Sequence, residues 1–412
     1  MRHISAYGAG ALALLLAAAC SSAPKQQSAP PRPEAATDVW ITPADGATGV
    51  RPDLPIMVGA AHGTLSQVTV QAAGKPVAGR LSADRTQWRS VRPMAPGRTY
   101  TVTAVVSGAS GEKRVTSRFT TVPAAQTFTI SSLLPNKEIT GDTVGVGMPI
   151  MITFDRPITD RVSVERHLRV LASKPVEGAW HWLDDTTVHY RPKKFWPAHT
   201  KVRVEALLEG APGGGDMYGD RDHVREFKIG RSQISTANVR THHMTVKRDG
   251  RTIRVIPISA GKGGVRKYHT TNGVHLAMSR ENVTIMTSPD AGPGDPGYYQ
   301  MTVYDTVRIS NSGEYVHGAP WSVGSQGRAN VSHGCVNVSP ANAKWFLKNT
   351  LIGDPVIVKG SPRELEPTNG WGQWQRSWPE WLKWSALRSG GITEALSGEK
   401  RTEVAAQGRT GS

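Results

Sequence analysis

Cysteine is almost absent from this sequence: 412 residues contain two, Cys20 and Cys335. Cys20 ends an N-terminal apolar segment that is typical of an export signal. The exported part therefore holds one thiol and cannot form an internal disulfide. The sequence also has no Cys-x-x-Cys or His-x-x-x-His pair, the usual spacings of a zinc site. A lone thiol in an oxidising compartment is a liability unless it is buried or used, so Cys335 needs an explanation.

Long hydrophobic runs are scarce as well. The small and apolar run over residues 9–19 is too short to span a membrane as a mature helix. Ala17-Ala18-Ala19-Cys20 follows it and resembles a lipoprotein signal, in which the cysteine is diacylated and becomes the new N-terminus. An ordinary secretory signal cut near Ala19 is the alternative. We expect a signal over residues 1–20 and a lipid anchor at Cys20. The folded part would then lie at the outer face of the cytoplasmic membrane, on a flexible linker over residues 21–37.

Acidic residues are outnumbered by basic ones. The chain has 49 Lys and Arg against 33 Asp and Glu, a formal net charge of +16. Such an excess favours an anionic partner, and nucleic acid is the usual one. The export signal argues against nucleic acid and leaves anionic material outside the cell.

Residues 38–122 and 127–230 are predicted to be two copies of one module. Pro55-Ile56-Met57-Val58 recurs as Pro149-Ile150-Met151-Ile152, and later Pro96-Gly97-Arg98-Thr99 recurs as Pro197-Ala198-His199-Thr200. Apolar and polar residues alternate along 100–106 and 201–207, a period of two that predicts strands. About one hundred residues a copy is typical of an immunoglobulin-like β-sandwich. Four tryptophans are predicted core residues rather than a sugar-binding platform: Trp88, Trp180, Trp182 and Trp196.

Residues 235–360 form a third, mostly β unit. Asp249-Gly250 predicts a hairpin between strands at 244–247 and 252–255. Further strands are expected at 302–304, 307–309 and 356–358. One helix is expected after Ser339, which can cap it, with Pro340 in its first turn.

Residues 361–390 contain five tryptophans at intervals of three or four: Trp371, Trp374, Trp378, Trp381 and Trp384. This spacing predicts one face of a helix, or two short turns broken at Pro379. We expect a packing appendage across the third unit, with a membrane-surface or glycan contact as the alternative. Residues 391–412 are polar and Gly-rich and are predicted to be disordered.

The chemistry is concentrated in Ser332-His333-Gly334-Cys335-Val336-Asn337, with His317 eighteen residues upstream of the cysteine. A cysteine nucleophile needs a base and backbone N–H groups for an oxyanion, and these residues can supply both. His317 would take the thiol proton or form an ion pair with the thiolate. A buried structural cysteine is the alternative for Cys335. A zinc site formed by His317, His333 and Cys335 is a second alternative. A papain-like protease is disfavoured, because in those enzymes the cysteine precedes the histidine in the sequence.

His317-Gly318 and this hexapeptide resemble the signature of the L,D-transpeptidases, cysteine enzymes that cross-link bacterial peptidoglycan. The resemblance covers residues 235–360 and includes the segments Arg308-Ile309-Ser310, Tyr315-Val316-His317, Ala319-Pro320-Trp321-Ser322-Val323-Gly324, Gln326-Gly327-Arg328-Ala329-Asn330 and Ser339-Pro340-Ala341-Asn342-Ala343. It implies a mixed sheet sandwich with the cysteine on its rim. It also implies a tetrapeptide stem donor, release of D-alanine, a 3→3 cross-link, no cofactor or metal, and inhibition by carbapenem-type β-lactams.

The same resemblance assigns roles to residues. Cys335 is the nucleophile and His317 the base, oriented by the carbonyl of Gly318, where the family usually has serine; glycine predicts a looser backbone there. His333 shapes the loop, Ser332 and Asn337 tie it down, and the oxyanion donors would be the N–H groups of Gly334 and Cys335, with that of Tyr299. Trp321, Tyr299 and Met286 would line the substrate cleft, under a Gly- and Pro-rich lid over 289–297. Two alternatives stay open: an L,D-carboxypeptidase using the same acyl-enzyme, and a non-catalytic wall-binding lipoprotein.

Overall fold

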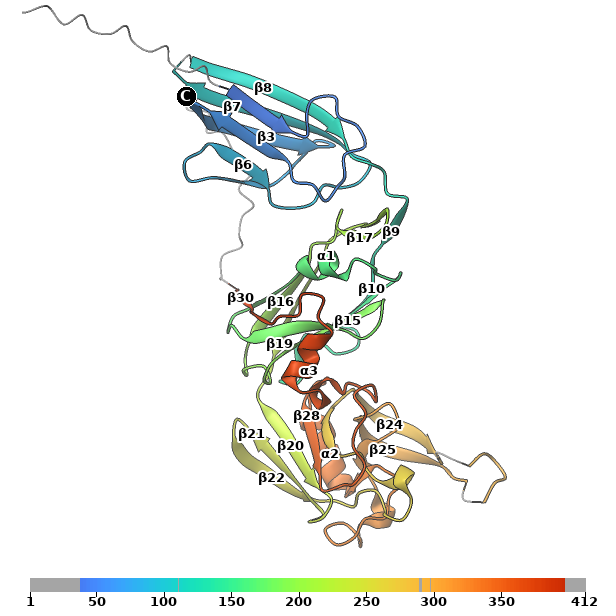
Figure 1. The fold of residues 1–412 in the computed structure, drawn as a ribbon. Coiled ribbons are helices and arrows are strands. Elements are labelled where there is room, and N and C mark those ends of the chain that lie inside the picture. The colour runs from blue at the N-terminus through green and yellow to red at the C-terminus, as the bar shows by residue number, and fades with distance from the viewer. Residues whose placement is uncertain (1–37, 110, 289–290, 297, 397–412) are drawn as a thin grey trace, which may run out of the picture.

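The computed structural model describes residues 38–109, 111–288, 291–296 and 298–396. The predicted signal with Cys20, the linker over 21–37, residues 289–290 and 297 of the predicted lid, and residues 397–412 lie outside the described residues. Three β units follow one another along the chain, and the C-terminal segment returns from the third to the second (Figure 1). Within the described ranges, no helix has the length and apolar character needed to cross a bilayer.

The first unit is a sandwich of two four-stranded sheets. In spatial order the first sheet contains β1 (Asp38–Thr42), β2 (Met57–Ala61), β6 (Gln87–Ser90) and β5 (Gly79–Leu81). The second contains β4 (Lys75–Pro76), β3 (Gly63–Ala72), β7 (Thr99–Gly108) and β8 (Gly111–Thr120). The core between them includes Trp88, Val58 and the stacked pair Tyr100 and Phe119, whose rings lie 5.4 Å apart. A cysteine-free sandwich is therefore closed by aromatic and aliphatic packing.

The second unit repeats this plan. One sheet orders β10 (Ile130–Leu134), β12 (Ile150–Phe154), β15 (Thr187–Pro192), β14 (Glu177–Trp182) and β29 (Gly391–Ile392). The other orders β11 (Thr143–Val144), β19 (His223–Ile229), β16 (Lys201–Ala206), β13 (Leu168–Ala172) and β30 (Glu394–Ala395). The remaining elements are a small sheet of β17 (Pro212–Gly214), β18 (Met217–Gly219) and β9 (Gln126–Phe128), and the helix α1 (Arg161–Arg166).

The repeated sequence segments occupy matching strands. Residues 55–58 lead into β2 and residues 149–152 into β12, while 100–106 lie in β7 and 201–206 form β16. Trp180, Trp182 and Trp196 are buried in the core of the second unit, as the sequence predicts.

The third unit has two sheets. One orders β22 (Arg251–Pro257), β21 (His243–Arg248), β20 (Gln233–Asn238), β28 (Pro355–Lys359) and β23 (Gly273–Leu276). The other orders β24 (Ser279–Thr287), β25 (Gln300–Arg308), β26 (Tyr315–Gly318) and β27 (Val336–Val338). The short helices are η1 (Arg266–Tyr268) and η2 (Pro320–Ser322), and the longer one is α2 (Pro340–Asn349).

Local signals in this unit give the expected elements. Asp249 and Gly250 have φ of 50° and 82°, as a two-residue hairpin turn requires. Ser339 caps α2, because its side chain accepts a hydrogen bond from Asn342 N at 3.3 Å. The prediction of separate strands at 302–304 and 307–309 is wrong. They are one strand, β25, which keeps a single register with β24 from Gln300 to Arg308.

The C-terminal segment packs on the third unit, as expected, where Gln375 Oε1 accepts from Val274 N at 2.7 Å, and it continues onto the second unit. It contains η3 (Gln373–Gln375) and α3 (Trp378–Lys383). Pro379 lies in the first turn of α3, where its missing N–H has no helical acceptor, so it begins the helix rather than breaking it. The fully buried Trp381 packs on the second unit: its Nε1 donates to Ala179 O at 2.9 Å, and its ring stacks on His181 at 4.2 Å.

The predicted disorder from residue 391 is also wrong for residues 391–395. β29 pairs with β14, and β30 pairs with β13, so this segment adds an edge strand to both sheets of the second unit. Open sheet edges offer unpaired N–H and C=O groups to such a segment, whatever its side chains. The segment therefore joins the third unit to the second by main-chain pairing.

Candidate active site

A cavity of about 610 Å³ opens at the rim of the third unit. Its lining comes from β24, β25, β26, η2 and the loops before β26 and β27. It includes nearly all the residues singled out from the sequence: Met286, Tyr299, His317, Trp321, Ser332, His333, Gly334, Cys335 and Asn337. Gly318 lies next to the cavity wall, in the same strand as His317.

Strand pairing brings the histidine and the cysteine together. β26 and β27 run parallel, with His317 opposite Asn337 and Gly318 opposite Val338. Alternate residues of a strand point to the same face, so Cys335, two residues before Asn337, lies on the face that His317 occupies. This register brings together His317 and Cys335, which are eighteen residues apart in the sequence, and both side chains line one cavity.

The His317 ring is held by the main chain of the next residue. Its Nδ1 lies 3.0 Å from Gly318 O, and a carbonyl only accepts, so Nδ1 carries the hydrogen and Nε2 keeps its lone pair. The side chain is 3% exposed, and burial lowers the pKa of His317. Gly318 pairs with Val338 inside the sheet, so its backbone is fixed and the looser backbone predicted for glycine is not found.

The thiol of Cys335 is held at the cavity wall, 3.6 Å from Gly313 O. Burial raises the pKa of the Cys335 thiol to about 12, the N–H of Tyr315 lowers it, and the Glu314 carboxylate adds to the rise. Thiol and imidazole are therefore both neutral at pH 7. The geometry supports proton transfer to His317 as the sulfur attacks, rather than a resting ion pair.

The loop before the cysteine is tied by short hydrogen bonds. Ser332 Oγ donates to Cys335 O at 2.6 Å and accepts from Gly334 N at 3.1 Å. Thr270 Oγ1 donates to Gly334 O at 2.7 Å. Gly334 has φ of 133°, in a region that a side chain would strain. These contacts fix the main chain on both sides of Cys335.

This bonding corrects the predicted oxyanion donors. Gly334 N–H already donates to Ser332 Oγ, and Tyr299 N–H donates to Ser288 Oγ at 3.3 Å. The N–H of Cys335 is the remaining donor of the predicted set. The Tyr299 ring lies instead beside His333, 5.6 Å between centroids, and Tyr268 meets the other side of His333 at 4.7 Å.

Comparison with known proteins identifies the family. A family model described as the L,D-transpeptidase catalytic domain matches residues 232–358, and one described as a bacterial Ig domain matches residues 47–212. L,D-transpeptidase 5 of Mycobacterium tuberculosis is 37% identical over 392 residues, covering 93% of this chain and 84% of the relative. L,D-transpeptidase 2 of the same species is 38% identical over 341 residues, covering 82% of each.

The chain belongs to the L,D-transpeptidase family. Its activity is the cross-linking of peptidoglycan by transpeptidation, as the motif predicts. Among solved structures, LD transpeptidase LdtMt1 in complex with imipenem is 36% identical; the match covers 56% of this chain and 98% of that one, with a TM-score of 0.48.

This L,D-transpeptidase also carries a buried polar cluster that the sequence did not indicate. Glu314, 4% exposed, accepts from Thr271 N on one carboxylate oxygen and from Thr271 Oγ1 on the other, both at 2.6 Å. The buried His275 has Nε2 2.8 Å from Thr271 O and Nδ1 3.1 Å from Ile309 O. Glu314 Oε2 lies 4.0 Å from Nδ1 of this ring.

The cluster adjoins the segments that contact Cys335 and Gly334. Glu314 follows Gly313, whose carbonyl faces the thiol, and Thr271 follows Thr270, which holds Gly334. The Glu314 carboxylate thus fastens the loop on one side of the thiol to the segment on the other. No local pattern could have revealed the contact, because Thr271 and Glu314 are 43 residues apart.

Two further predicted cleft residues lie at the mouth of the cavity. Trp321 is 54% exposed, with its ring 6.0 Å from that of His317. Met286 lies in β24 opposite Met301 of β25, and both line the cavity. Across the described part of the chain, no three His, Cys, Asp or Glu side chains gather as a metal ion would require, and His317, His333 and Cys335 form no such group.

Proposed function

We propose that Cys335 forms a thioester with the third residue of a tetrapeptide stem and passes it to a neighbouring stem, which yields a 3→3 cross-link. The single observation that carries this mechanism is the β26–β27 register, which sets a neutral, carbonyl-oriented His317 beside a neutral Cys335 in one cavity. A neutral pair is the correct starting state for general-base attack by a thiol.

In this mechanism His317 carries the proton between the thiol, the leaving group and the acceptor amine. As Cys335 Sγ bonds to the donor carbonyl carbon, its proton passes to His317 Nε2, and the oxyanion accepts a hydrogen bond from Cys335 N–H. The resulting imidazolium, whose Nδ1–H stays on Gly318 O, gives its proton to the nitrogen of the leaving D-alanine. The acceptor amine then attacks the thioester, His317 takes its proton, and collapse returns that proton to the thiolate.

The test is product identification. The chain from residue 38 onward is incubated with a disaccharide-tetrapeptide, and the products are weighed. A dimer that has lost D-alanine supports transpeptidation. Tripeptide without dimer means that water takes the acyl group, as in a carboxypeptidase. The Cys335→Ala protein serves as the matched control and should give neither product.

A carbapenem-type β-lactam should acylate Cys335, because its strained ring presents an acyl donor to the same nucleophile. LdtMt1, the relative in complex with imipenem, is 36% identical to this chain. Intact-mass spectrometry should find one adduct per chain and none on Cys335→Ala. An adduct on the Cys335→Ala protein would count against this nucleophile.

We place the enzyme at the outer face of the cytoplasmic membrane through a diacylated Cys20, on the strength of the signal-like segment before it. A lipid chain contributes about 0.8 kcal/mol per buried CH₂, so losing the anchor should decide partitioning. Cys20→Ser should move the protein to the soluble fraction with unchanged specific activity. Retention in the membrane fraction would refute the anchor.

A further inference from the structure

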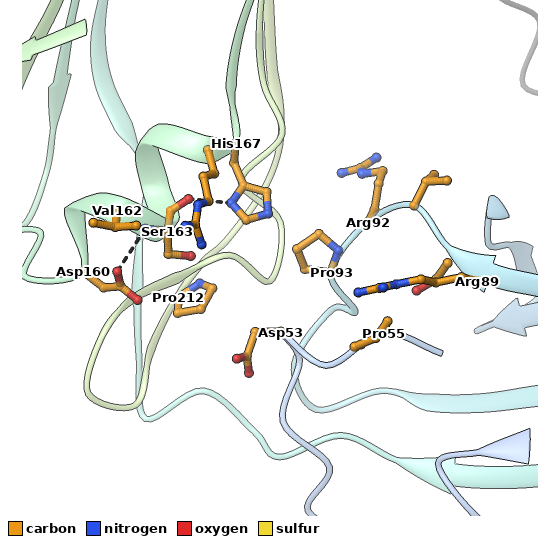
Figure 2. Close-up of a pocket in the computed structure, with 13 residues that line it drawn as sticks. Asp53, Pro55, Arg89, Arg92, Pro93, Asp160, Val162, Ser163, His167 and Pro212 are labelled. Carbon is orange, nitrogen blue, oxygen red and sulfur yellow. Dashed lines mark hydrogen bonds between the residues drawn. The ribbon is translucent and has the colours of Figure 1, made fainter. Parts of the chain in front are cut away.

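A second cavity, of about 420 Å³, lies between the two Ig-like units. Figure 2 shows Arg89, Arg92 and Pro93 of the first unit facing Asp160, Ser163 and His167 of the second. Arg166, next to His167 at the end of α1, also lines it. The second unit separates this cleft from the catalytic cavity (Figure 1), so it cannot belong to the acyl-transfer site.

The joint that forms the cleft is tightly packed. Gly210 of the second unit, at φ +75°, lies so close to the first that an added Cβ would be 1.9 Å from Met94 O. Arg92 bridges the units through a salt bridge to Asp222, whose other oxygen accepts from Glu209 N at 3.0 Å. These contacts hold the walls of the cleft in fixed positions, and a preformed site loses less entropy on binding.

The two acidic residues that line the cleft each accept hydrogen bonds from a neighbouring residue. Asp53 accepts two hydrogen bonds from Arg51, at 2.7 and 3.0 Å. Asp160 accepts from Ser163 N at 3.0 Å as the cap of α1. In the part of the chain that the structure describes, neither carboxylate forms a salt bridge with an arginine that lines the cleft.

Two of the three arginines that line the cleft lack an ionic partner in the part of the chain that the structure describes. Within residues 38–396 as described, neither Arg89 nor Arg166 forms a salt bridge. In the same part of the chain, Arg92 Nε is buried and has no hydrogen-bond partner. The cleft thus presents two guanidinium groups that form no salt bridge, those of Arg89 and Arg166, and two such groups match the oxygens of a carboxylate.

We propose that this inter-unit cleft binds carboxylate groups of peptidoglycan stem peptides and holds the wall polymer while the distant catalytic cavity acts on another stem. The inference rests on the proposed function for its polymer, and its ligand chemistry comes from Arg89 and Arg166. Two linked contacts on one polymer raise the effective concentration of substrate at the second site.

The test measures binding without turnover. In a Cys335→Ala background, Arg89→Ala/Arg166→Ala is compared with Arg114→Ala/Arg156→Ala, which removes the same charge from exposed arginines of the same two units outside the cleft. Cosedimentation with purified wall sacculi should be about tenfold weaker for the cleft pair and unchanged for the control pair. With Cys335 present, both pairs should process a soluble disaccharide-tetrapeptide at the parent rate.

Treated sacculi identify the ligand. Amidation of the stem carboxylates should remove the difference between the parent and the cleft variant, whereas acid stripping of phosphodiester-linked polymers should preserve it. The proposal would be overturned if both arginine pairs lost binding to sacculi equally, or if neither lost it. It would also be overturned if the difference between the parent and the cleft variant disappeared when the phosphodiester-linked polymers were removed. Because binding is measured without catalysis, a failed cross-linking assay with intact arginine-dependent binding would sink only the acyl-transfer mechanism.

Discussion

Gly318→Ser tests whether the residue after His317 acts through its carbonyl alone. A Cβ built on Gly318 would lie 3.2 Å from Tyr304 O, so β25 must yield by a few tenths of an ångström, and 3.4 Å from the Cβ of Ala343 in α2, which is ordinary van der Waals contact. The backbone itself is suitable: Gly318 lies in β26, opposite Val338, and has no positive φ.

Two opposing effects set the magnitude. Replacing a strand glycine restricts the unfolded chain and stabilises by roughly 0.5–1 kcal/mol. Crowding a packed position costs about 1–3 kcal/mol. We expect a net loss of up to about 2 kcal/mol in the free energy of unfolding. The His317 Nδ1–H bond to the carbonyl survives, so kcat/KM should stay within about tenfold, or 1.4 kcal/mol of barrier.

The assay combines kcat/KM on the disaccharide-tetrapeptide, its pH dependence, and thermal unfolding. Gly318→Ala is the matched control, because it adds the same Cβ without a hydroxyl. If the Ser and Ala variants have the same kcat/KM, the carbonyl of residue 318 is sufficient to orient His317. A hundredfold fall in kcat at normal unfolding temperature, in both variants, would refute the carbonyl as the orienting group for His317.

Three further predictions concern the thiol, the polar cluster and the C-terminal segment. A neutral thiol predicts slow alkylation of Cys335 by iodoacetamide at pH 7 that accelerates steadily up to pH 10, and a plateau by pH 8 would contradict the raised thiol pKa. Glu314→Gln leaves one donor of Thr271 without an acceptor, so the free energy of unfolding should fall by about 1–3 kcal/mol and β-lactam acylation should slow. Unchanged values of both would show that Glu314 does not hold the loop before β26 in place. Burial lowers the pKa of His181 to about 4, against 6.5 when unfolded, so the unfolded chain binds more protons and stability should fall as pH drops from 6.5 to 4. Burial also lowers the pKa of His189, to about 3, so a His181→Asn variant should reduce this slope without abolishing it, and an unaltered slope would refute the contribution of His181.

The sequence by itself determined the local elements and the chemistry. The Asp249-Gly250 turn, the Ser339 cap and the repeated strand segments depend on residues within a few positions, and each formed as predicted. The motif around Cys335 predicted the family because it sets histidine, glycine and cysteine in a fixed order, and the family model matches these residues. Such signals survive in sequence because backbone geometry and residue type are coupled locally.

Tertiary structure alone decided the rest. The end of the C-terminal segment pairs with open sheet edges about 200 residues earlier, which is why the disorder predicted for residues 391–395 was wrong. The Glu314–His275 contact and the arginine cleft likewise arise from contacts between segments with independent local preferences. Hydrogen bonds and charges act through space, so which donors are spent and which remain available is fixed only when the units pack together.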